Sequence, residues 1–257
     1  MITSTSNQQI KNLSELLKKP KARKEQQVFV VEGKKMFDEV CARRGMLVKA
    51  YFSESYMEEN FSGCEEPAFD FEVVSDSVFN SVAETVTPQG VLAIIRVQNY
   101  EISDIMKRGA NILILEDIQD PGNLGTMFRT AEAAGMAGII MSKNTVDIYN
   151  PKVIRSTMGA IFRLPFVYVT DLKESLTELK NDYNINLIAT HLAAKCDYTQ
   201  ADYSKGVGIL IGNEGNGLSD EISAMADERV IIPMCGEVES LNAAVAAALM
   251  MFECRRH

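Results

Sequence analysis

Residues that build disulfide or zinc scaffolds are scarce in this sequence. It holds five cysteines, scattered without a C-x-x-C pair, and only two histidines, His191 and His257. An odd number of widely spaced cysteines argues against a disulfide framework and against a zinc site. The cysteines are Cys41, Cys64, Cys196, Cys235 and Cys254. We therefore expect a protein without a structural metal.

Long apolar runs are also missing. No uninterrupted apolar run approaches the roughly 18 to 20 residues that a membrane helix needs. The start, Met1–Ser4, does not open the apolar stretch of a signal peptide. We therefore expect a cytoplasmic protein that does not contact membranes. With 257 residues, of which 46% are hydrophobic and 24% charged, the chain is long enough for one large or two ordinary globular domains.

An overall excess of positive charge is absent too. The chain carries 26 Lys+Arg against 35 Asp+Glu, and a net charge of −9 argues against a nucleic-acid partner. The distribution is uneven, however, because residues 1–50 hold 11 basic against 5 acidic side chains, and residues 51–100 hold 1 against 9. Such a concentrated basic patch is typical of an RNA contact, although a solvated helix face explains a charge run equally well.

Helical and strand periodicities alternate along almost the whole chain. This alternation predicts an α/β fold with a largely parallel sheet. The polar stretch at residues 98–101 is the best candidate linker, so we predict a first domain over residues 1–99 and a second over residues 104–257. Helices are predicted at residues 7–19 (ended by Pro20), 77–83, 123–134 and 241–254. A further helix, which carries Met36, Phe37, Val40 and Cys41, is predicted to follow Gly33 and to end at Gly45. Strands are predicted at residues 28–31, 47–52, 71–74, 91–97, 112–116, 138–141, 166–169, 187–190, 207–211 and 230–232.

Three segments rich in glycine, asparagine or small residues follow predicted strands, where open α/β sheets bind ligands. The first runs from Asp117 to Thr130. Asn123 is placed to cap the next helix, whose free N–H groups favour an anion. Arg129, about a turn and a half further on, could reach a phosphate or a developing oxyanion. Taken alone, this segment is better explained by a capped turn and an exposed arginine.

The second segment, Ile211–Leu218, reads I-G-N-E-G-N-G-L. Its three glycines let the backbone approach a ligand closely, and Glu214 offers an acceptor for a hydroxyl, an amine or a cation. A tight turn explains the glycines equally well. The segment lacks the Gly-Lys-Ser/Thr ending of a phosphate loop and the G-x-G-x-x-G order of a dinucleotide site, which disfavours an oxidoreductase.

The third segment runs from Ile232 to Ala248 and ends in a run rich in alanine. Ser240 is predicted to be the N-cap of the final helix. Small residues in a helix are typical of close packing against a neighbour. Ser240 and Asn242, at the mouth of this helix, could also hydrogen-bond a carboxylate or a ribose.

In order, the stretches N-L-G-x-x-x-R-T-A, I-G-N-E-G-N-G-L and I-P-M-x-G-x-x-x-S-L-N-x-x-V-A-A resemble the three motifs of the SpoU/TrmH family of RNA ribose 2′-O-methyltransferases, in the SPOUT superfamily. The basic region before Phe29–Gly33 looks like the RNA substrate-binding domain that precedes the catalytic domain in many members. The resemblance implies a deep C-terminal trefoil knot, a rare exception among folds. It also implies S-adenosylmethionine as cofactor, a homodimer, and structured RNA as substrate, ribosomal rather than transfer RNA.

The resemblance further implies roles for individual residues. The catalytic site would comprise Arg129, Asn123, Glu214, Ser240 and Asn242. The cofactor would contact Thr190, Gly212, Asn213, Ile232, Met234 and Leu241. Together with the charge pattern, the resemblance assigns RNA contacts to Lys18, Lys19, Lys21, Arg23, Lys24 and Lys34. No metal is implied.

The expected role of Arg129 follows from the chemistry of its guanidinium group. In the family it activates the ribose 2′-hydroxyl, but a guanidinium stays protonated in proteins and is a poor general base. We therefore expect Arg129 to hold the target phosphate or to stabilise the 2′-oxyanion as it forms. A non-catalytic RNA-binding or ribosome-assembly protein on the same scaffold is the alternative, and it would bind RNA without binding the cofactor. A member that confers antibiotic resistance is also compatible with the sequence.

Overall fold

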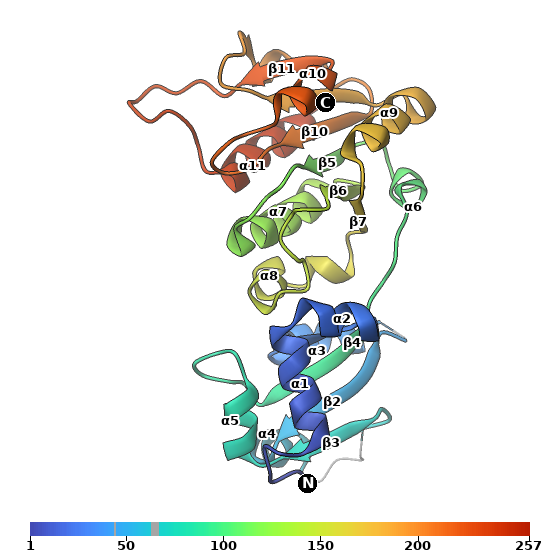
Figure 1. Ribbon diagram of the computed structural model, residues 1–257, viewed down its shortest axis with the longest axis vertical. Coiled ribbons are helices and arrows are strands. Elements are labelled where there is room, and N and C mark those ends of the chain that lie inside the picture. Colours follow the sequence, from blue (N-terminus) through green and yellow to red (C-terminus); the bar gives the residue numbers. More distant parts are fainter. Residues whose placement is uncertain (44, 63–66) are drawn as a thin grey trace. The chain divides into compact units, whose positions relative to one another are not determined.

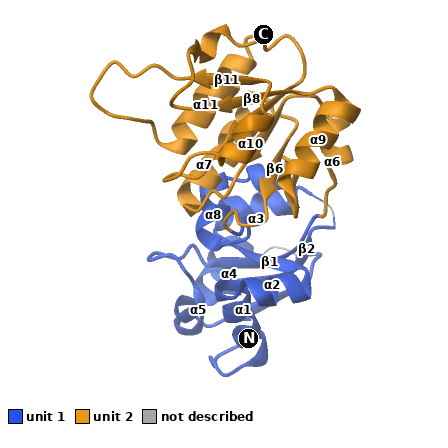
Figure 2. Ribbon diagram, turned by 45° about the horizontal axis from the view of Figure 1, so that its top comes forward, with its two compact units in different colours: residues 1–98, 147–162 blue, residues 99–146, 163–257 orange. Residues whose placement is uncertain are grey.

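The computed structural model describes residues 1–43, 45–62 and 67–257. The chain forms two compact units (Figure 2): unit 1 comprises Met1–Gln98 with Asp147–Phe162, and unit 2 comprises Asn99–Val146 with Arg163–His257. Residues 147–162 thus pack within unit 1, although they lie inside the second predicted domain. The division into domains 1–99 and 104–257 stays a prediction. Cys64 lies outside the described residues, and the other four cysteines are free thiols.

Unit 1 contains a sheet of four strands in the order β1-β4-β2-β3 (Figure 1). The strands are β1 (Val28–Glu32), β2 (Leu47–Ser53), β3 (Phe71–Val74) and β4 (Val91–Arg96). All four were predicted to within about a residue at each end. β4 runs antiparallel to both β1 and β2, and only β2 and β3 are parallel. The parallel arrangement predicted from the alternation of elements is therefore wrong for this unit, where the sheet is mixed.

Six helices lie in the described part of unit 1. They are α1 (Gln8–Lys18), α2 (Pro20–Gln26), α3 (Lys34–Cys41), α4 (Glu54–Phe61), α5 (Asp76–Val82) and α8 (Pro151–Thr157), with a 3-10 turn η1 (Ala160–Phe162) after α8. Pro20 ends α1 as predicted and also begins α2. Proline is tolerated there because the backbone N–H that it lacks would have no hydrogen-bond partner in the first turn of a helix. The sequence did not predict α2, α4 or α8.

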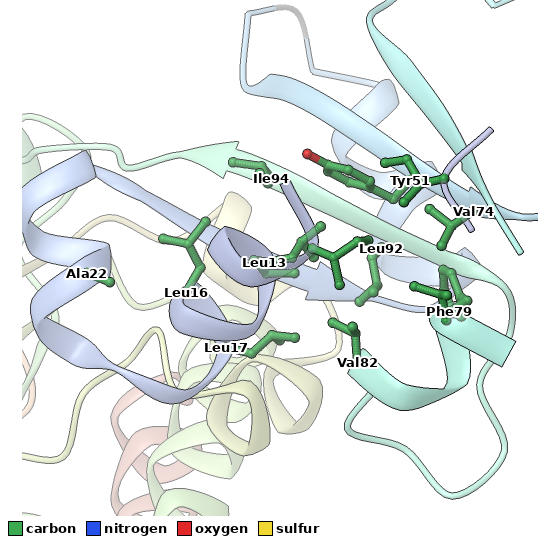
Figure 3. Close-up of a cluster of buried hydrophobic side chains, with 14 residues drawn as sticks. Leu13, Leu16, Leu17, Ala22, Tyr51, Val74, Phe79, Val82, Leu92 and Ile94 are labelled. Atoms are coloured by element: carbon green, nitrogen blue, oxygen red, sulfur yellow. The ribbon is translucent and has the colours of Figure 1, made fainter. Parts of the chain in front are cut away.

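One core cluster of unit 1 lies between α1, α2 and α5 and one face of the sheet (Figure 3). Leu13, Leu16 and Leu17 recur at helical spacing on α1 and are at most 3% exposed. They pack with Leu92 of β4, with side chains of α5 and with the remaining members of the same cluster. This burial fixes α1 on the sheet.

Unit 2 contains a sheet of seven strands in the order β7-β6-β5-β10-β8-β11-β9, and every neighbouring pair is parallel. The predicted parallel sheet is therefore confirmed here. The strands are β5 (Ile112–Leu115), β6 (Gly138–Ser142), β7 (Phe166–Val169), β8 (Asn186–Thr190), β9 (Cys196–Asp197), β10 (Val207–Ile211) and β11 (Glu228–Ile231). The helices are α6 (Ile102–Met106), α7 (Pro121–Ala134), α9 (Leu172–Tyr183), α10 (Asp220–Met225) and α11 (Ala243–Cys254), with a 3-10 turn η2 (Tyr198–Gln200) after β9.

Both faces of this sheet are covered. Ile112 and Ile114 of β5 join a cluster with side chains of α6, α9 and α10, whereas the alternate residues Leu113 and Leu115, also fully buried, lie outside that cluster. α11 packs against α7 and β10 (Figure 1). Burial on both faces explains why β5 reads as a continuous apolar run. In the described part of the chain, no helix combines the length and the apolar character that spanning a membrane requires.

Candidate active site

A cavity of about 530 Å³ opens in unit 2 where the carboxyl ends of β8, β10 and β11 meet. Open α/β sheets bind ligands at this edge. All six residues predicted to contact a cofactor line the cavity, together with Glu214 and Ser240 of the predicted catalytic set. The lining comprises Thr190, His191, Leu192, Ile211, Gly212, Asn213, Glu214, Gly215, Asn216, Gly217, Leu218, Val230, Ile231, Ile232, Met234, Glu239, Ser240, Leu241, Ala243 and Ala246.

The loop after β10 forms one wall of the cavity. A Cβ on Gly212 would lie 2.1 Å from the carbonyl carbon of Gly217 and from the N atom of Leu218, so only glycine fits there. Asn213 and Gly217 exchange two backbone hydrogen bonds across the loop, of 2.9 and 3.0 Å. The Asn213 side chain accepts from the N–H groups of Gly215 and Asn216 and donates to the carbonyl of Asp117. Its amide is thus used to shape the loop.

Glu214 connects this loop to the start of α7. Its carboxylate accepts hydrogen bonds from the backbone N–H groups of Gln119 and Asp120 and from Nδ2 of Asn123, each at 3.0 Å. Partial burial acts to raise the pKa of Glu214, but these hydrogen bonds outweigh it and hold the pKa below its ordinary value. Glu214 is therefore an ionised acceptor that orients its donors, and a poor proton acceptor for a substrate.

Asn123 joins the third motif to the other two. Its Oδ1 accepts a hydrogen bond of 2.9 Å from Nδ2 of Asn242, while its own Nδ2 donates to Glu214. The Asn242 Oδ1 in turn accepts from the N–H groups of Ala244 and Val245 at the start of α11. One hydrogen-bonded chain, Glu214–Asn123–Asn242, thus links all three predicted motifs.

Two predicted helix caps are wrong. The N-cap of α7 is Asp120, whose Oδ1 accepts from the N–H of Asn123, so the helix begins at Pro121, before Asn123. The N-cap of α11 is Asn242 and the helix begins at Ala243, two residues after the predicted Leu241. Asn and Asp cap helices as well as Ser does, and Ser240 remains an exposed cavity residue.

Arg129 lies apart from this network. It projects from α7 as an exposed side chain and does not line the cavity. No hydrogen bond or ion pair engages its guanidinium within the described part of the chain. The structure thus brings Asn123, Glu214 and Asn242 into direct contact, places Ser240 in the adjoining cavity, and leaves Arg129 free for a substrate.

The predicted RNA contacts in unit 1 divide into two groups. Five side chains are exposed, namely Lys18, Lys19, Lys21, Lys24 and Lys34. Arg23 is only 3% exposed, so assigning it to RNA is wrong. Its Nη1 donates to the carbonyls of Leu16 and Leu17 at the end of α1, and its Nη2 lies 2.6 Å from Oδ2 of Asp147. Arg23 therefore holds α1, α2 and the 147–162 segment together.

Sequence reasoning missed several residues of the site. Asp120 caps α7, and Asp followed by Pro is a helix-start signal that the sequence displayed. His191 and Leu192 line the cavity directly after Thr190, in a loop that carries no motif. Among the described residues, no group of three or more His, Cys, Asp or Glu side chains is arranged to hold a metal ion.

Comparison with known proteins identifies the family of this chain. A model of the SpoU rRNA Methylase family matches residues 110–252, and a model of the MRM3-like substrate binding domain matches residues 7–93. The chain belongs to the SpoU methylase family. It is therefore an RNA methyltransferase, as the three motifs predicted.

Relatives and solved structures match almost the full chain. The 23S rRNA (guanosine(2553)-2′-O)-methyltransferase RlmP of Bacillus subtilis is 31% identical over 254 residues, covering 99% of this chain and 98% of that protein. The AdoMet-bound rRNA methyltransferase from Sinorhizobium meliloti superposes with a TM-score of 0.86 at 32% identity, covering 100% and 97% of the two chains. A crystal structure of an RNA 2′-O ribose methyltransferase gives a TM-score of 0.81 at 32% identity, covering 99% and 98%. The mixed α/β fold with a mostly parallel sheet is thus that of SpoU methyltransferases.

Proposed function

We propose that this SpoU family member transfers a methyl group from S-adenosylmethionine to a ribose 2′-hydroxyl of structured RNA, with ribosomal RNA as substrate. The Glu214–Asn123–Asn242 chain carries the proposal, because it assembles polar groups of all three motifs beside one cavity. The names of relatives that match almost the full chain, which specify 2′-O-methylation of RNA, support the reaction. We further propose residues 1–99 as the RNA-reading domain, residues 104–257 as the methyl-transfer domain, and the cytoplasm as the site of action.

The cavity fits S-adenosylmethionine in size and chemistry. About 530 Å³ lies within the usual range of roughly 300 to 1,000 Å³ for small-molecule sites. Gly212 keeps the loop wall free of a side chain, Ile232, Met234 and Leu241 supply apolar surface, and Thr190 supplies a hydroxyl. When bound, the cofactor supplies an electrophilic sulfonium methyl group. These residues would hold it and exclude water from the methyl group.

The chain's own residues would act on the RNA. Arg129 offers a permanent positive charge that no described residue pairs with, which suits the target phosphate and the negative charge that develops on the 2′-oxygen. The exposed Ser240 hydroxyl can hydrogen-bond the ribose. Glu214 keeps Asn123 and Asn242 in one orientation. Positioning of this kind supplies much of the rate in a direct displacement.

We propose that the C-terminal segment forms the deep trefoil knot expected from the motifs. β10 lies between β5 and β8 in the sheet, although β6, β7 and β8 precede it in the chain. After β11 the chain returns to place α11 against β10 and α7. The loops after β10 and after β11 line the same cavity. Passage of the last segment through a loop is compatible with this path.

We also propose a homodimer that uses α11. Val245, Leu249 and Phe252 lie on one side of this helix at spacings of four and three residues, and they are 48%, 37% and 47% exposed. An apolar stripe of this kind is typical of a covered interface. A second copy of the chain would bury it.

Methyl transfer to RNA tests the proposal. Purified protein is incubated with ribosomal RNA transcribed in vitro and with S-adenosylmethionine labelled in its methyl group. We expect labelled RNA whose modified nucleotide resists alkaline hydrolysis, because a 2′-O-methyl group removes the attacking hydroxyl. Arg129→Ala should abolish transfer while calorimetry shows cofactor binding unchanged. RNA binding without cofactor binding would instead support a non-catalytic RNA-binding protein.

A further inference from the structure

The loop after α5, residues 83–90, is fixed to unit 1 by a buried carboxylate. Glu32, at the end of β1, is only 8% exposed. Its carboxylate accepts from the backbone N–H groups of Glu84 and Thr85, at 3.0 and 3.2 Å, and from the hydroxyl of Thr85. A buried carboxylate is costly unless it is fully hydrogen-bonded. Here the donors come from the loop, so the loop has a defined conformation.

The other end of this loop is fixed as well. Gln89 accepts a hydrogen bond of 2.9 Å from the N–H of Lys34, at the start of α3. Gly90 has φ +76°, and a Cβ there would lie 2.6 Å from the Cβ of Tyr56, so this position requires glycine. The loop projects from unit 1 (Figure 1), and Val86 within it has an exposed fraction of 101%. A fixed loop thus presents a valine that nothing in the described chain covers.

A cavity of about 600 Å³ lies at the base of this loop. Its lining consists of Lys34, Lys35, Asp38, Glu39, Ala42, Arg43 and Gln89. Lys34 pairs with Asp38 at 3.3 Å and Arg43 with Glu39 at 3.0 Å. Lys35 is exposed and has no ion pair within the described residues. Among the described residues of this lining, Lys35 is therefore the cation without an ion pair, and the carboxylate of Asp38 can accept from further N–H groups.

This combination matches the chemistry of an unpaired nucleotide. Proteins read RNA sequence mainly at single-stranded loops and bulges, because the groove of an A-form helix hides the base edges. An unpaired nucleotide presents a phosphate, N–H groups on the base edge and an apolar base face. Lys35 complements the phosphate, the carboxylate of Asp38 complements the N–H groups, and Val86 complements the base face.

We propose that the 83–90 loop and the cavity at its base bind one unpaired nucleotide of the RNA substrate, with Lys35 on its phosphate and Val86 against its base. This site rests on the proposed function, since it deepens the role of the first domain in reading RNA. The site is distinct from the exposed lysines around α1 and α2, two of which, Lys19 and Lys21, form ion pairs with glutamates. Unit 1 thereby selects the substrate by an unpaired base as well as by charge.

Salt-dependent binding tests the site. The full-length protein is titrated with in vitro transcribed ribosomal RNA at several salt concentrations. Val86→Ser should weaken binding about tenfold without changing the salt slope, because it removes only an apolar contact. Lys35→Ala should lower the magnitude of the slope by about 0.7, the value for one phosphate of a single strand. Both side chains are exposed, so neither change should disturb folding.

Matched controls are Val48→Ser, another exposed valine in unit 1, and Lys205→Ala, an exposed lysine in unit 2. We expect both controls to bind RNA like the wild type. Wild-type affinity and slope in both Val86→Ser and Lys35→Ala would overturn the site while leaving the proposed function intact. Normal RNA binding by the wild type without methyl transfer would overturn the proposed function. The RNA affinities and salt slopes of Val86→Ser and Lys35→Ala would in that case still show whether the nucleotide site exists.

Cross-linking supplies an independent readout. With Val86→p-benzoylphenylalanine, irradiation should attach the protein to a nucleotide that chemical probing shows to be unpaired. The position is read as a stop in reverse transcription. Attachment within a continuous duplex would overturn the proposal.

Discussion

The two units differ in where they place their hydrogen-bonded charges. In unit 1, Arg23 and Glu32 are 3% and 8% exposed, and each binds groups from a distant part of the sequence. In unit 2, Glu214 makes three comparable hydrogen bonds, but it lies at the mouth of a cavity and is exposed. The chemistry of the bonds is similar, whereas the surroundings are not.

This difference separates two uses of a charge. A buried charge that loses its partner leaves an uncompensated group, so its removal costs stability. A charge at a cavity mouth keeps access to water, so its removal costs little stability and instead disturbs the groups that it orients. Substitution of the three residues should therefore give different results in unfolding and in methyl transfer.

Arg23→Ala should have the largest effect. It leaves the carboxylate of Asp147 and the carbonyls of Leu16 and Leu17 without their donor, at a cost of about 3 kcal/mol in the free energy of unfolding. Urea unfolding of the full chain measures this loss. Lys24→Ala, on the same helix but exposed, is the control and should unfold like the wild type. Equal stability of the two variants would contradict a structural role for Arg23.

Glu214→Gln should lower kcat about 100-fold, because misplacement of catalytic groups by about 1 Å costs that much. The replacement cannot accept on both side-chain atoms, so it loses part of its hold on Gln119, Asp120 and Asn123. Single-turnover methyl transfer measures the rate. The unfolding free energy should change by less than about 1 kcal/mol. Glu174→Gln, an exposed residue on α9, controls for the loss of charge.

Glu32→Gln should lower stability and leave kcat almost unchanged, which is the reverse of the result expected for Glu214→Gln. The loss of charge-assisted hydrogen bonds to Glu84 and Thr85 should cost about 2 kcal/mol in stability. RNA affinity should fall as the 83–90 loop loosens, while kcat at saturating RNA stays near the wild-type value. Glu84→Gln, on the loop itself and exposed, is the control. A fall in kcat without a change in KM would show that Glu32 does not act through RNA binding.

The sequence predicted the parallel sheet of unit 2 and the groups around its cavity, because both depend on local patterns. Strands such as β5 are short apolar runs, and the glycines of the Gly212–Leu218 loop mark a close backbone approach. Helices in which apolar residues alternate with many charged or polar ones were harder to predict. α9 and α10 carry apolar residues between many polar ones, and packing on the sheet decides their formation.

Long-range contacts account for the errors. Nothing near Arg23 in the sequence shows that Asp147, 124 residues away, would bury it, so its charge resembled that of the neighbouring lysines. The same applies to Glu32, whose donors follow 52 and 53 residues later. Asn123 and Asn242 meet across 119 residues, and only the family resemblance brought them together beforehand.

The pH dependence of unit 2 gives the smallest expected effect. Hydrogen bonds hold the pKa of Glu214 below its ordinary value despite partial burial, so the folded state binds its proton less tightly than the unfolded chain. Such a group contributes stability at pH values above its unfolded pKa. The contribution is lost as the pH falls through the lower folded value. Between pH 6 and 8 this carboxyl stays ionised, so the orientation of Asn123 and the cofactor affinity should not change with pH through Glu214.

Cofactor affinity measured by calorimetry from neutral to acid pH checks this prediction. The wild type should lose affinity only below the ordinary range of a glutamate, and Glu214→Gln should lack that acidic transition. Because Glu214 is exposed, the change in unfolding free energy across the same range should be small. A transition near neutral pH that disappears in Glu214→Gln would mean that this carboxyl exchanges protons during the reaction. Glu214 would then be a catalytic base, and the contrast with the buried Glu32 would be one of chemistry as well as of exposure.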